Sequence, residues 1–255
     1  MFSLQFQLLP DVQMAQLNMD SLRFYLQGES HLVHSLYELL CNNCFEILLR
    51  NPKNRAGRPI ALPPSALRQV GFEQDEGLLP YTRRSFLGYR LLQEYFAFPE
   101  KFFFLEIGGL AAMREAGFEE SFEIVFQIGK FDQPERQQTL EVGVSTKTVR
   151  LNCVPVVNLF KQTAEPILIS HQRYEYPVVA DMRRQAAMEI FSIDDVVSTR
   201  PNSSEVIQYE PFYSYRHATL RDATKTFWLA TRRESARIND PGTDVYLSLI
   251  DLSGR

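Results

Sequence analysis

The sequence predicts an α+β protein, in which a mixed α/β first half packs with a mostly β second half made of short antiparallel strands. Three observations support this fold class: alternating apolar residues near the N-terminus, two segments with helical periodicity in the first half, and turn-separated β-type runs in the second. We therefore expect an α+β domain over residues 1–132 and a β-rich domain over residues 133–255.

The first half is expected to open with two strands and a helix. Apolar residues alternate with polar ones over residues 2–8, which is typical of a half-buried strand, and a second strand covers 22–26. Ser30 can then cap a helix that runs to about residue 43. This helix, over residues 30–43, has apolar residues on one face and polar residues on the other.

A second helix is expected over residues 85–96. Its apolar residues cover roughly 200° of the helical surface, so neighbours should cover most of it. Arg90, Gln93 and Glu94 mark the remaining side, which we expect to face water. Pro99 lies just past the end of this helix, where proline is common.

Further strands are predicted from short runs of β-branched, aromatic and leucine residues. In the first half these runs cover residues 45–49, 102–107 and 122–128. In the second half they cover residues 149–157, 167–170, 188–193, 206–209, 226–231 and 244–252. The polar stretch 130–148 separates the two sets and is the favoured domain boundary.

Composition excludes several classes of function. The 27 Lys and Arg residues against 31 Asp and Glu residues give a net charge of −4, so we expect no binding to nucleic acid. No apolar stretch is long enough for a membrane span, and the N-terminus lacks the features of a signal peptide. With three cysteines and no export signal, the expected compartment is a reducing cytoplasm, without a disulfide framework.

Cys41 and Cys44 have CxxC spacing, with His31 and His34 upstream, so a zinc site is one hypothesis. On one helix, however, His34 and Cys41 would lie about 10.5 Å apart along the axis, too far for direct ligation of one ion. A redox motif would need the pair at a helix N-terminus, whereas here it falls at a C-terminus. Structural cysteines are therefore favoured, and no cofactor is expected.

Other candidates for chemistry are isolated. Asp194 and Asp195 would point to opposite faces of a strand, so a turn or strand-end pair is the favoured interpretation. His171 and His217 have no nucleophile motif nearby, and no Walker, zincin or nucleophile-elbow motif occurs. We expect the chain not to be an enzyme.

Aromatic residues point instead toward contact surfaces. The chain has 19 Phe and 11 Tyr, and the segment LPYTRRSFLGYRLLQEYFAFPEKFFFLEI over residues 79–107 is especially rich in them. Consecutive phenylalanines at 102–104 would lie on both faces of a strand. The sheet would then be covered on both sides, either by its own domain or by a partner.

Residues 79–107 resemble the signature of the TssF family, also called ImpG or VasA, a baseplate component of bacterial type VI secretion systems. Three further parts agree in order: RLNCVPVVNLF at 150–160, residues 164–170 with 176–179, and DVYLSLIDL at 244–252. The resemblance extends from about residue 17 to the end of the chain. Members of the family are longer, and the chain begins and ends in strand-like sequence, so we expect a central fragment.

The resemblance implies a structural role in the wedge of a phage-tail-like baseplate, on which the contractile sheath and tube assemble. It implies TssG and TssK as partners, with TssE and a second TssF copy as further candidates. The expected location is the bacterial cytoplasm, with the baseplate docked at the inner-membrane complex and no direct membrane insertion. The family has no known catalytic residues.

Five residues are candidates for partner contact, with internal packing or a solvated charge as the alternative for each: Arg83, Arg84, Phe98, Phe103 and Tyr176. The alternative function is a stand-alone β-rich module that binds a ligand or carbohydrate through Trp228 and tyrosines.

Overall fold

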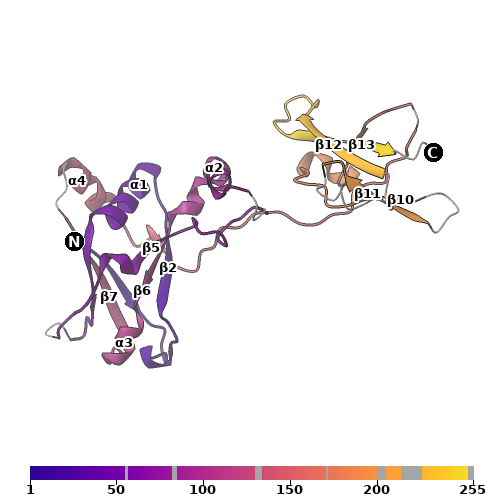
Figure 1. Cartoon of the computed structure of the whole chain (residues 1–255). Helices are drawn as coiled ribbons and strands as arrows, with labels where there is room; N and C mark the ends of the chain where they lie inside the picture. The colour runs from indigo at the N-terminus through magenta and orange to yellow at the C-terminus, as the bar shows by residue number, and fades with distance from the viewer. Residues whose placement is uncertain are drawn as a thin grey trace. The chain divides into compact units, whose positions relative to one another are not determined.

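The computed structural model describes residues 1–54, 57–81, 85–129, 134–170, 172–199, 205–213 and 226–251. The chain divides into two compact units, Met1–Val157 and Asn158–Arg255 (Figure 1). This division falls later than the boundary expected at residue 132. The reason is that residues 149–150 pair with a strand of the first unit.

The first unit contains two four-stranded sheets in which every pair of neighbouring strands is antiparallel. The first sheet has the order β1 (Phe2–Gln7), β7 (Ser121–Ile128), β3 (Cys44–Arg50) and β4 (Ile60–Leu62). The second has the order β5 (Leu67–Val70), β6 (Phe104–Gly108), β2 (Ser21–Leu26) and β8 (Val149–Arg150).

Four α-helices accompany these sheets in the described part of the first unit: α1 (Ser30–Glu38), α2 (Leu87–Ala97), α3 (Ala111–Glu115) and α4 (Pro134–Gly143). A π-helical turn (Leu39–Asn43) follows α1, and 3-10 turns cover Met14–Gln16, Pro64–Ala66 and Pro99–Phe103. Figure 1 shows α1 and α4 at one end of the sheets and α3 at the other. None of the described helices is long and apolar enough to cross a membrane.

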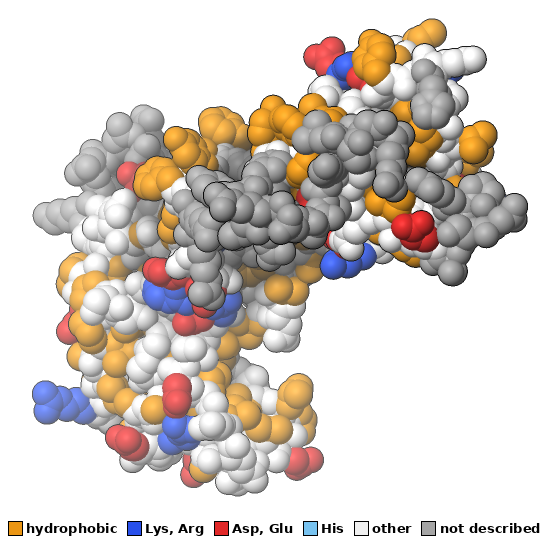
Figure 2. Space-filling model, turned by 45° about the vertical axis from the view of Figure 1, so that its right-hand side comes forward, with side chains coloured by type: hydrophobic (Ala, Val, Ile, Leu, Met, Phe, Trp, Pro, Cys, Tyr) orange, Lys and Arg blue, Asp and Glu red, His pale blue; other side chains and the backbone are white. Residues whose placement is uncertain are grey.

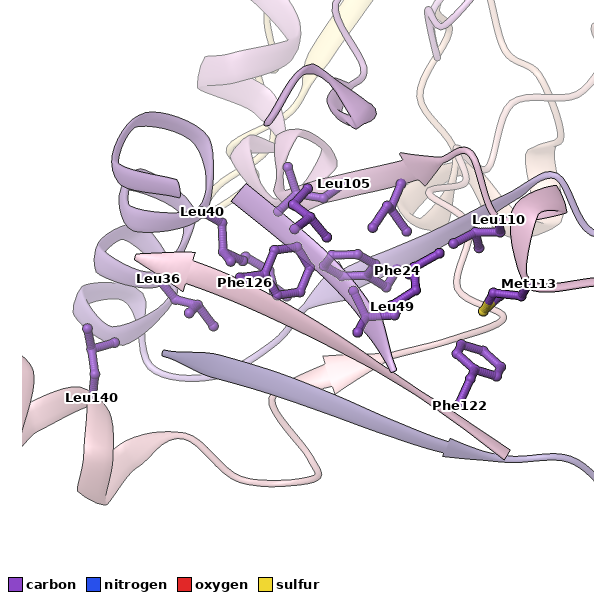
Figure 3. Packing of buried hydrophobic residues seen from close by; sticks show 14 of the residues in the cluster. Phe24, Leu36, Leu40, Leu49, Leu105, Leu110, Met113, Phe122, Phe126 and Leu140 are labelled. Carbon is purple, nitrogen blue, oxygen red and sulfur yellow. The ribbon is translucent and has the colours of Figure 1, made fainter. Parts of the chain in front are cut away.

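One hydrophobic core joins the two sheets of the first unit to α1, α3 and α4. Side chains along a strand point alternately to its two faces, so β1 contributes every second residue to this core. Strand β7 is buried on both faces over much of its length. Figure 3 shows side chains from both sheets and the helices converging on this core, among them Phe24, Leu36, Leu40, Leu49, Leu105, Phe122, Phe126 and Leu140.

The second unit contains a five-stranded sheet with a small core. Its order is β10 (Val196–Thr199), β11 (Val206–Pro211), β12 (Thr226–Glu234), β13 (Thr243–Asp251) and β9 (Tyr176–Pro177), and a 3-10 segment covers Met182–Ala187. The pairings are antiparallel except between β11 and β12, which are parallel. The buried hydrophobic residues described in this unit are Tyr176, Phe227, Val245 and Leu247.

The α+β class is confirmed, as are most strands of the first half and those near 206–209, 226–231 and 244–252. Two predictions about where an element begins are wrong. Ser30 is the first residue of α1 rather than its cap, because the extended backbone lies at Glu29. The strand expected from residue 102 begins at Phe104, because a 3-10 turn after Pro99 includes Phe102 and Phe103.

Three further expectations differ from the structure. The polar stretch 130–148 contains α4, and the strand expected at 149–157 is limited to β8. The runs at 167–170 and 188–193 form no strand in the described part of the chain, whereas the short β9 and β10 do. Strand propensity expresses fit to a paired surface, so β-type residues without a partner strand do not form one.

Candidate interaction surface

Helix α2 turns charged side chains inward and aromatic side chains outward. Arg90 and Glu94 are each 2% exposed, whereas Tyr89 is 67% and Phe96 is 80% exposed. The prediction that Arg90 and Glu94 face water is therefore wrong. The reason is that the loop 71–81 lies beneath the helix, and its backbone carbonyl and N–H groups form hydrogen bonds with these two charged side chains.

Arg90 is held by backbone carbonyl groups of this loop. Its guanidinium donates to the carbonyl oxygens of Gln74 at 2.7 Å and Glu73 at 2.6 Å. Its Nε lies 3.8 Å from Glu94 Oε2, one turn along the helix. A Cβ at position 77 would lie 2.8 Å from Arg90 Nη1, so a side chain in place of Gly77 would displace the guanidinium from its place against the loop.

Glu94 and Lys101 form a buried ion pair at the centre of the same contact. Lys101 Nζ also donates to the carbonyl oxygen of Gly71 at 3.1 Å. Glu94 Oε1 accepts hydrogen bonds from the backbone N–H groups of Leu78 at 2.7 Å and Leu79 at 3.2 Å. With these additional hydrogen bonds the buried charges have partners, as charges removed from water require.

The electrostatics of Glu94 agree with this arrangement. Burial alone raises the pKa of the Glu94 carboxyl, but the hydrogen bond from Lys101 and those from Leu78 and Leu79 outweigh it, so the net pKa lies below its ordinary value. Glu94 is therefore ionised at neutral pH. The pair therefore anchors the inner face of α2 through charge, beside the half-buried Leu87 and Leu91.

A second polar network anchors the loop 71–81 to the sheet. Glu76 accepts hydrogen bonds from Arg68 at 3.0 Å and from the backbone N–H of Gly71 at 2.6 Å. Arg68 and Arg23 both contact Glu106, at 3.4 and 2.9 Å, which ties β5, β6 and β2 together. Burial raises the pKa of Glu76, but hydrogen bonds from backbone N–H groups and from Arg68 lower it by more. The net pKa of Glu76 therefore lies below its ordinary value.

The outward side of α2 and its two ends is almost entirely apolar. We call this the α2 surface; its residues are Phe86, Tyr89, Leu92, Tyr95, Phe96 and Phe98, which are 71%, 67%, 58%, 51%, 80% and 40% exposed. Five of the six are aromatic, each with about 150–250 Å² to bury, so at these exposures the six together expose roughly 700 Å². The largest apolar patch of a typical monomer is about 300–600 Å². Figure 2 shows hydrophobic side chains reaching the surface at several places on the face it draws.

Three residues of the α2 surface have the spacing of a helix-packing seam. Tyr89, Leu92 and Phe96 are separated by three and then four residues, as the a and d positions of a heptad are. All three are more than half exposed. The free side of α2 therefore has the pattern that other helices use for packing.

The predicted contact residues fall in different environments. Phe98 belongs to the α2 surface, where its backbone N–H donates to the carbonyl oxygen of Glu94 at 2.8 Å. Phe103 is half-buried, with its ring 4.9 Å from that of His34. Arg83 and Arg84 lie outside the described residues.

Tyr176, the fifth predicted contact residue, lies in the second unit and is 7% exposed. Its hydroxyl donates to the carbonyl oxygen of Ser170 and accepts from the N–H of the same residue. It thus has internal partners. A role in partner contact stays a prediction for all five residues.

The cysteines have the surroundings of structural thiols. Burial raises the pKa of both Cys41 and Cys44, which disfavours the reactive thiolate. Cys44 Sγ donates to the carbonyl oxygen of Glu46. Among the described residues, no group of three or more His, Cys, Asp or Glu side chains could hold a metal ion.

The remaining candidates are not brought together. Asp194 and Asp195 are exposed just before β10, and Asp194 Oδ2 lies 3.7 Å from Lys161 Nζ. His171 and His217 lie outside the described residues. A surface groove of about 700 Å³ lies between the start of α1 and the segment from α4 to β8, and its lining does not include Trp228.

Sequence reasoning missed the buried cluster of Arg90, Glu94 and Lys101. A signal was available, because Arg90 and Glu94 are four residues apart and so lie on one face of a helix. The periodicity of α2 shows which side chains share a face. It does not show which face is covered.

This α+β chain exposes a large apolar face on α2, and buried charges hold that helix from its other side. These are features of a subunit of a larger assembly. The family model for "Type VI secretion system, TssF" matches residues 1–255. The chain belongs to this family, and the resemblance inferred from its sequence is confirmed.

Two known proteins extend this result. Over 245 residues the chain is 32% identical to the type VI secretion system component TssF1 of Pseudomonas aeruginosa, covering 92% of this chain and 38% of that protein. The fold of this chain is also similar to that of a chain in the cryo-electron microscopy structure of the type VI secretion system TssK-TssF-TssG baseplate subcomplex. That similarity has a TM-score of 0.65 and 22% identity, and covers 97% of this chain and 47% of the other. The chain thus spans less than half the length of either protein.

Proposed function

We propose that this chain is part of a structural, non-catalytic subunit of the type VI secretion baseplate wedge, where it supports assembly of the contractile sheath and tube. The observation that carries the proposal is the α2 surface, because exposed apolar area of this size marks a site of contact with another protein. Membership of the TssF family and the likeness to a chain of a TssK-TssF-TssG baseplate subcomplex support it.

TssG and TssK are the proposed partners, and TssE and a second TssF copy are further candidates. The proposed location is the bacterial cytoplasm, with the baseplate docked at the inner-membrane complex. In this proposal the α2 surface contacts another baseplate subunit, and the seam of Tyr89, Leu92 and Phe96 packs against it.

The cluster beneath α2 suits this role. Arg90 and Lys101 hold the helix by hydrogen bonds to the loop 71–81, so the outer face is positioned before a partner binds. A preorganised surface loses less conformational entropy on binding than a mobile one. The roughly 700 Å² of the α2 surface is close to the about 800 Å² per partner of a standard interface.

The test uses the full-length protein that carries this chain, co-produced with TssG and TssK of the same bacterium. The double substitution Leu92→Glu with Phe96→Glu places two charges on the α2 surface. We expect it to abolish co-purification of at least one partner while leaving the circular dichroism spectrum unchanged, because both side chains are exposed.

Val142→Glu is the matched control. Val142 is 82% exposed on α4, so this variant adds a charge to an equally open apolar position away from α2. We expect it to bind as the unaltered protein does. Full recovery of both partners by the double variant would contradict the proposal.

A further inference from the structure

Strand β1 is the longest outer strand of the two sheets in the described part of the first unit. It has six residues, whereas the other outer strands, β4, β5 and β8, have three, four and two. Native proteins commonly keep edge strands short, or protect them with a charge, a proline or a bulge. In β1 the sequence FSLQFQ contains no charged residue and no proline, and its pairing with β7 has no bulge. The edge is therefore open to a further strand.

The backbone groups on the free side of β1 belong to Ser3, Gln5 and Gln7. In an antiparallel pair the N–H and C=O of one residue point to the same side, and successive residues alternate between the two sides. Leu8 donates its N–H to the carbonyl oxygen of Glu120, so the even-numbered residues bond on the side of β7. The N–H and C=O of the three odd-numbered residues thus point away from the sheet, and no described residue bonds to them.

The side chains of β1 divide in the same way. The odd-numbered residues are polar, uncharged and exposed. The even-numbered residues, Phe2, Leu4, Phe6 and Leu8, are apolar and half-buried against the main core. A strand added beside β1 would cover more of this apolar face only if it had the same alternation in matching register.

A second copy of β1 supplies that alternation. If two copies pair antiparallel about a two-fold axis at Gln5, this residue lies opposite its own copy, Ser3 lies opposite Gln7, and Leu4 lies opposite Phe6. Polar residues then face polar residues and apolar residues face apolar residues. All three free residues become hydrogen-bonded pairs, with about six main-chain hydrogen bonds in total.

The absence of charge distinguishes a second copy from other occupants. Around a two-fold axis each residue lies opposite itself or a close neighbour in the same strand, so a charge in β1 would lie near an identical charge, which is destabilising. A strand from a different protein, or from the rest of a longer polypeptide, could carry the opposite charge and would give β1 no reason to exclude charges. Self-pairing alone requires an uncharged strand.

We propose that β1 is a self-association edge, at which two copies of the chain pair antiparallel about a two-fold axis at Gln5 and join their sheets. The occupant of the edge is a second copy of β1. This inference extends the proposed function, which names a second copy as a candidate partner and assigns it no surface. It involves neither the α2 surface nor the contacts with TssG and TssK.

The first test gives position 5 either charge in the full-length protein that carries this chain. Gln5 is exposed, so Gln5→Lys and Gln5→Glu should both fold, with unchanged circular dichroism. Each variant alone places like charges opposite each other at the axis, and we expect each to raise the homodimer Kd about fivefold or more in analytical ultracentrifugation. A mixture of the two places opposite charges at the axis and should restore the dimer.

Gln93→Lys and Gln93→Glu are the matched controls, at an exposed glutamine on α2. We expect them to change the homodimer Kd less than about twofold. Equal weakening by the variants at positions 5 and 93 would overturn the inference, as would a mixture of the two position-5 variants that stays monomeric. A monomeric unaltered protein would also overturn it, because the second copy would then not occupy the edge.

Cysteine substitutions test the register, with Cys153→Ser in each variant because Cys153 is exposed. Gln5→Cys places two thiols opposite each other across the axis. Ser3→Cys places its two thiols about 14 Å apart along the strands, too far for a disulfide. We expect oxidation to cross-link the first variant into dimers and not the second. Equal cross-linking of both, or of Ser3→Cys alone, would overturn the proposed pairing.

Binding of the unaltered protein to TssG and TssK separates this inference from the proposed function. If the protein dimerises through position 5 but binds neither TssG nor TssK, the proposed function fails and the self-association stands. If it binds them but neither dimerises nor cross-links at position 5, only the self-association fails.

Discussion

Helices α1 and α2 are both amphipathic, but α1 buries its apolar face whereas α2 buries charged residues. Helix α1 buries Leu32, Val33 and Leu36 in the main core. Helix α2 buries Arg90 and Glu94 and leaves its aromatic residues more than half exposed. Periodicity fixes which residues share a face, whereas the neighbours decide which face is covered.

The difference also separates two ways of attaching a helix. The apolar face of α1 holds it to the core by removal of apolar area from water. The inner face of α2 depends on an ion pair and on hydrogen bonds to the loop 71–81, which need specific partners at specific distances. Such an attachment leaves the apolar side of α2 available for another protein.

The largest effect should come from breaking the charged attachment of α2. Glu94→Leu leaves Lys101 buried without its counter-charge, and we expect it to lower the free energy of unfolding by about 3–5 kcal/mol. Urea unfolding followed by circular dichroism measures this change. Gln93→Leu, at the exposed neighbouring position, is the control and should stay within about 0.5 kcal/mol. Equal stability of the two variants would show that the pair does not hold the helix.

A direct comparison of the two helices uses one leucine from each. Leu36 is 2% exposed on α1, so Leu36→Ala should cost about 2–5 kcal/mol of unfolding free energy by loss of packing and creation of a cavity. Leu92 is 58% exposed on α2, so Leu92→Ala should change it by about 0.5 kcal/mol or less. Similar losses in the same urea experiment would mean that α2 also packs through its apolar side.

The smallest effect is a pH dependence of the loop 71–81. Burial opposes ionisation of Glu76 and Glu94, but their hydrogen bonds outweigh it and lower the pKa of both carboxyl groups. A lowered folded-state pKa stabilises the protein above the unfolded value of about 4.3, and this stabilisation is lost as pH falls through the folded pKa. We expect Glu76→Gln to lose less stability than the unaltered protein when urea midpoints are measured from pH 5 downward. Parallel curves for the two proteins would contradict this expectation.

Much of the fold could be predicted from sequence, because alternation in β1 and β7 and the periodicity of α1 arise from a core within the same unit. The orientation of α2 could not, since it depends on backbone carbonyl and N–H groups of residues 71–79 that no side-chain pattern reveals. The extent of β8 was overestimated for a related reason. Residues 152–157 have the composition of a strand, but no strand in the described part of the chain pairs with them.

The central claim is that another baseplate subunit covers the α2 surface. Leu92→Cys places a thiol on that surface, and Val142→Cys places one on α4; peptide mass spectrometry after maleimide labelling follows each separately from Cys41, Cys44 and Cys153. We expect position 92 to react readily in the free full-length protein and to be protected in its complex with TssG and TssK, while position 142 stays reactive in both. Undiminished labelling of position 92 in the complex would contradict the claim.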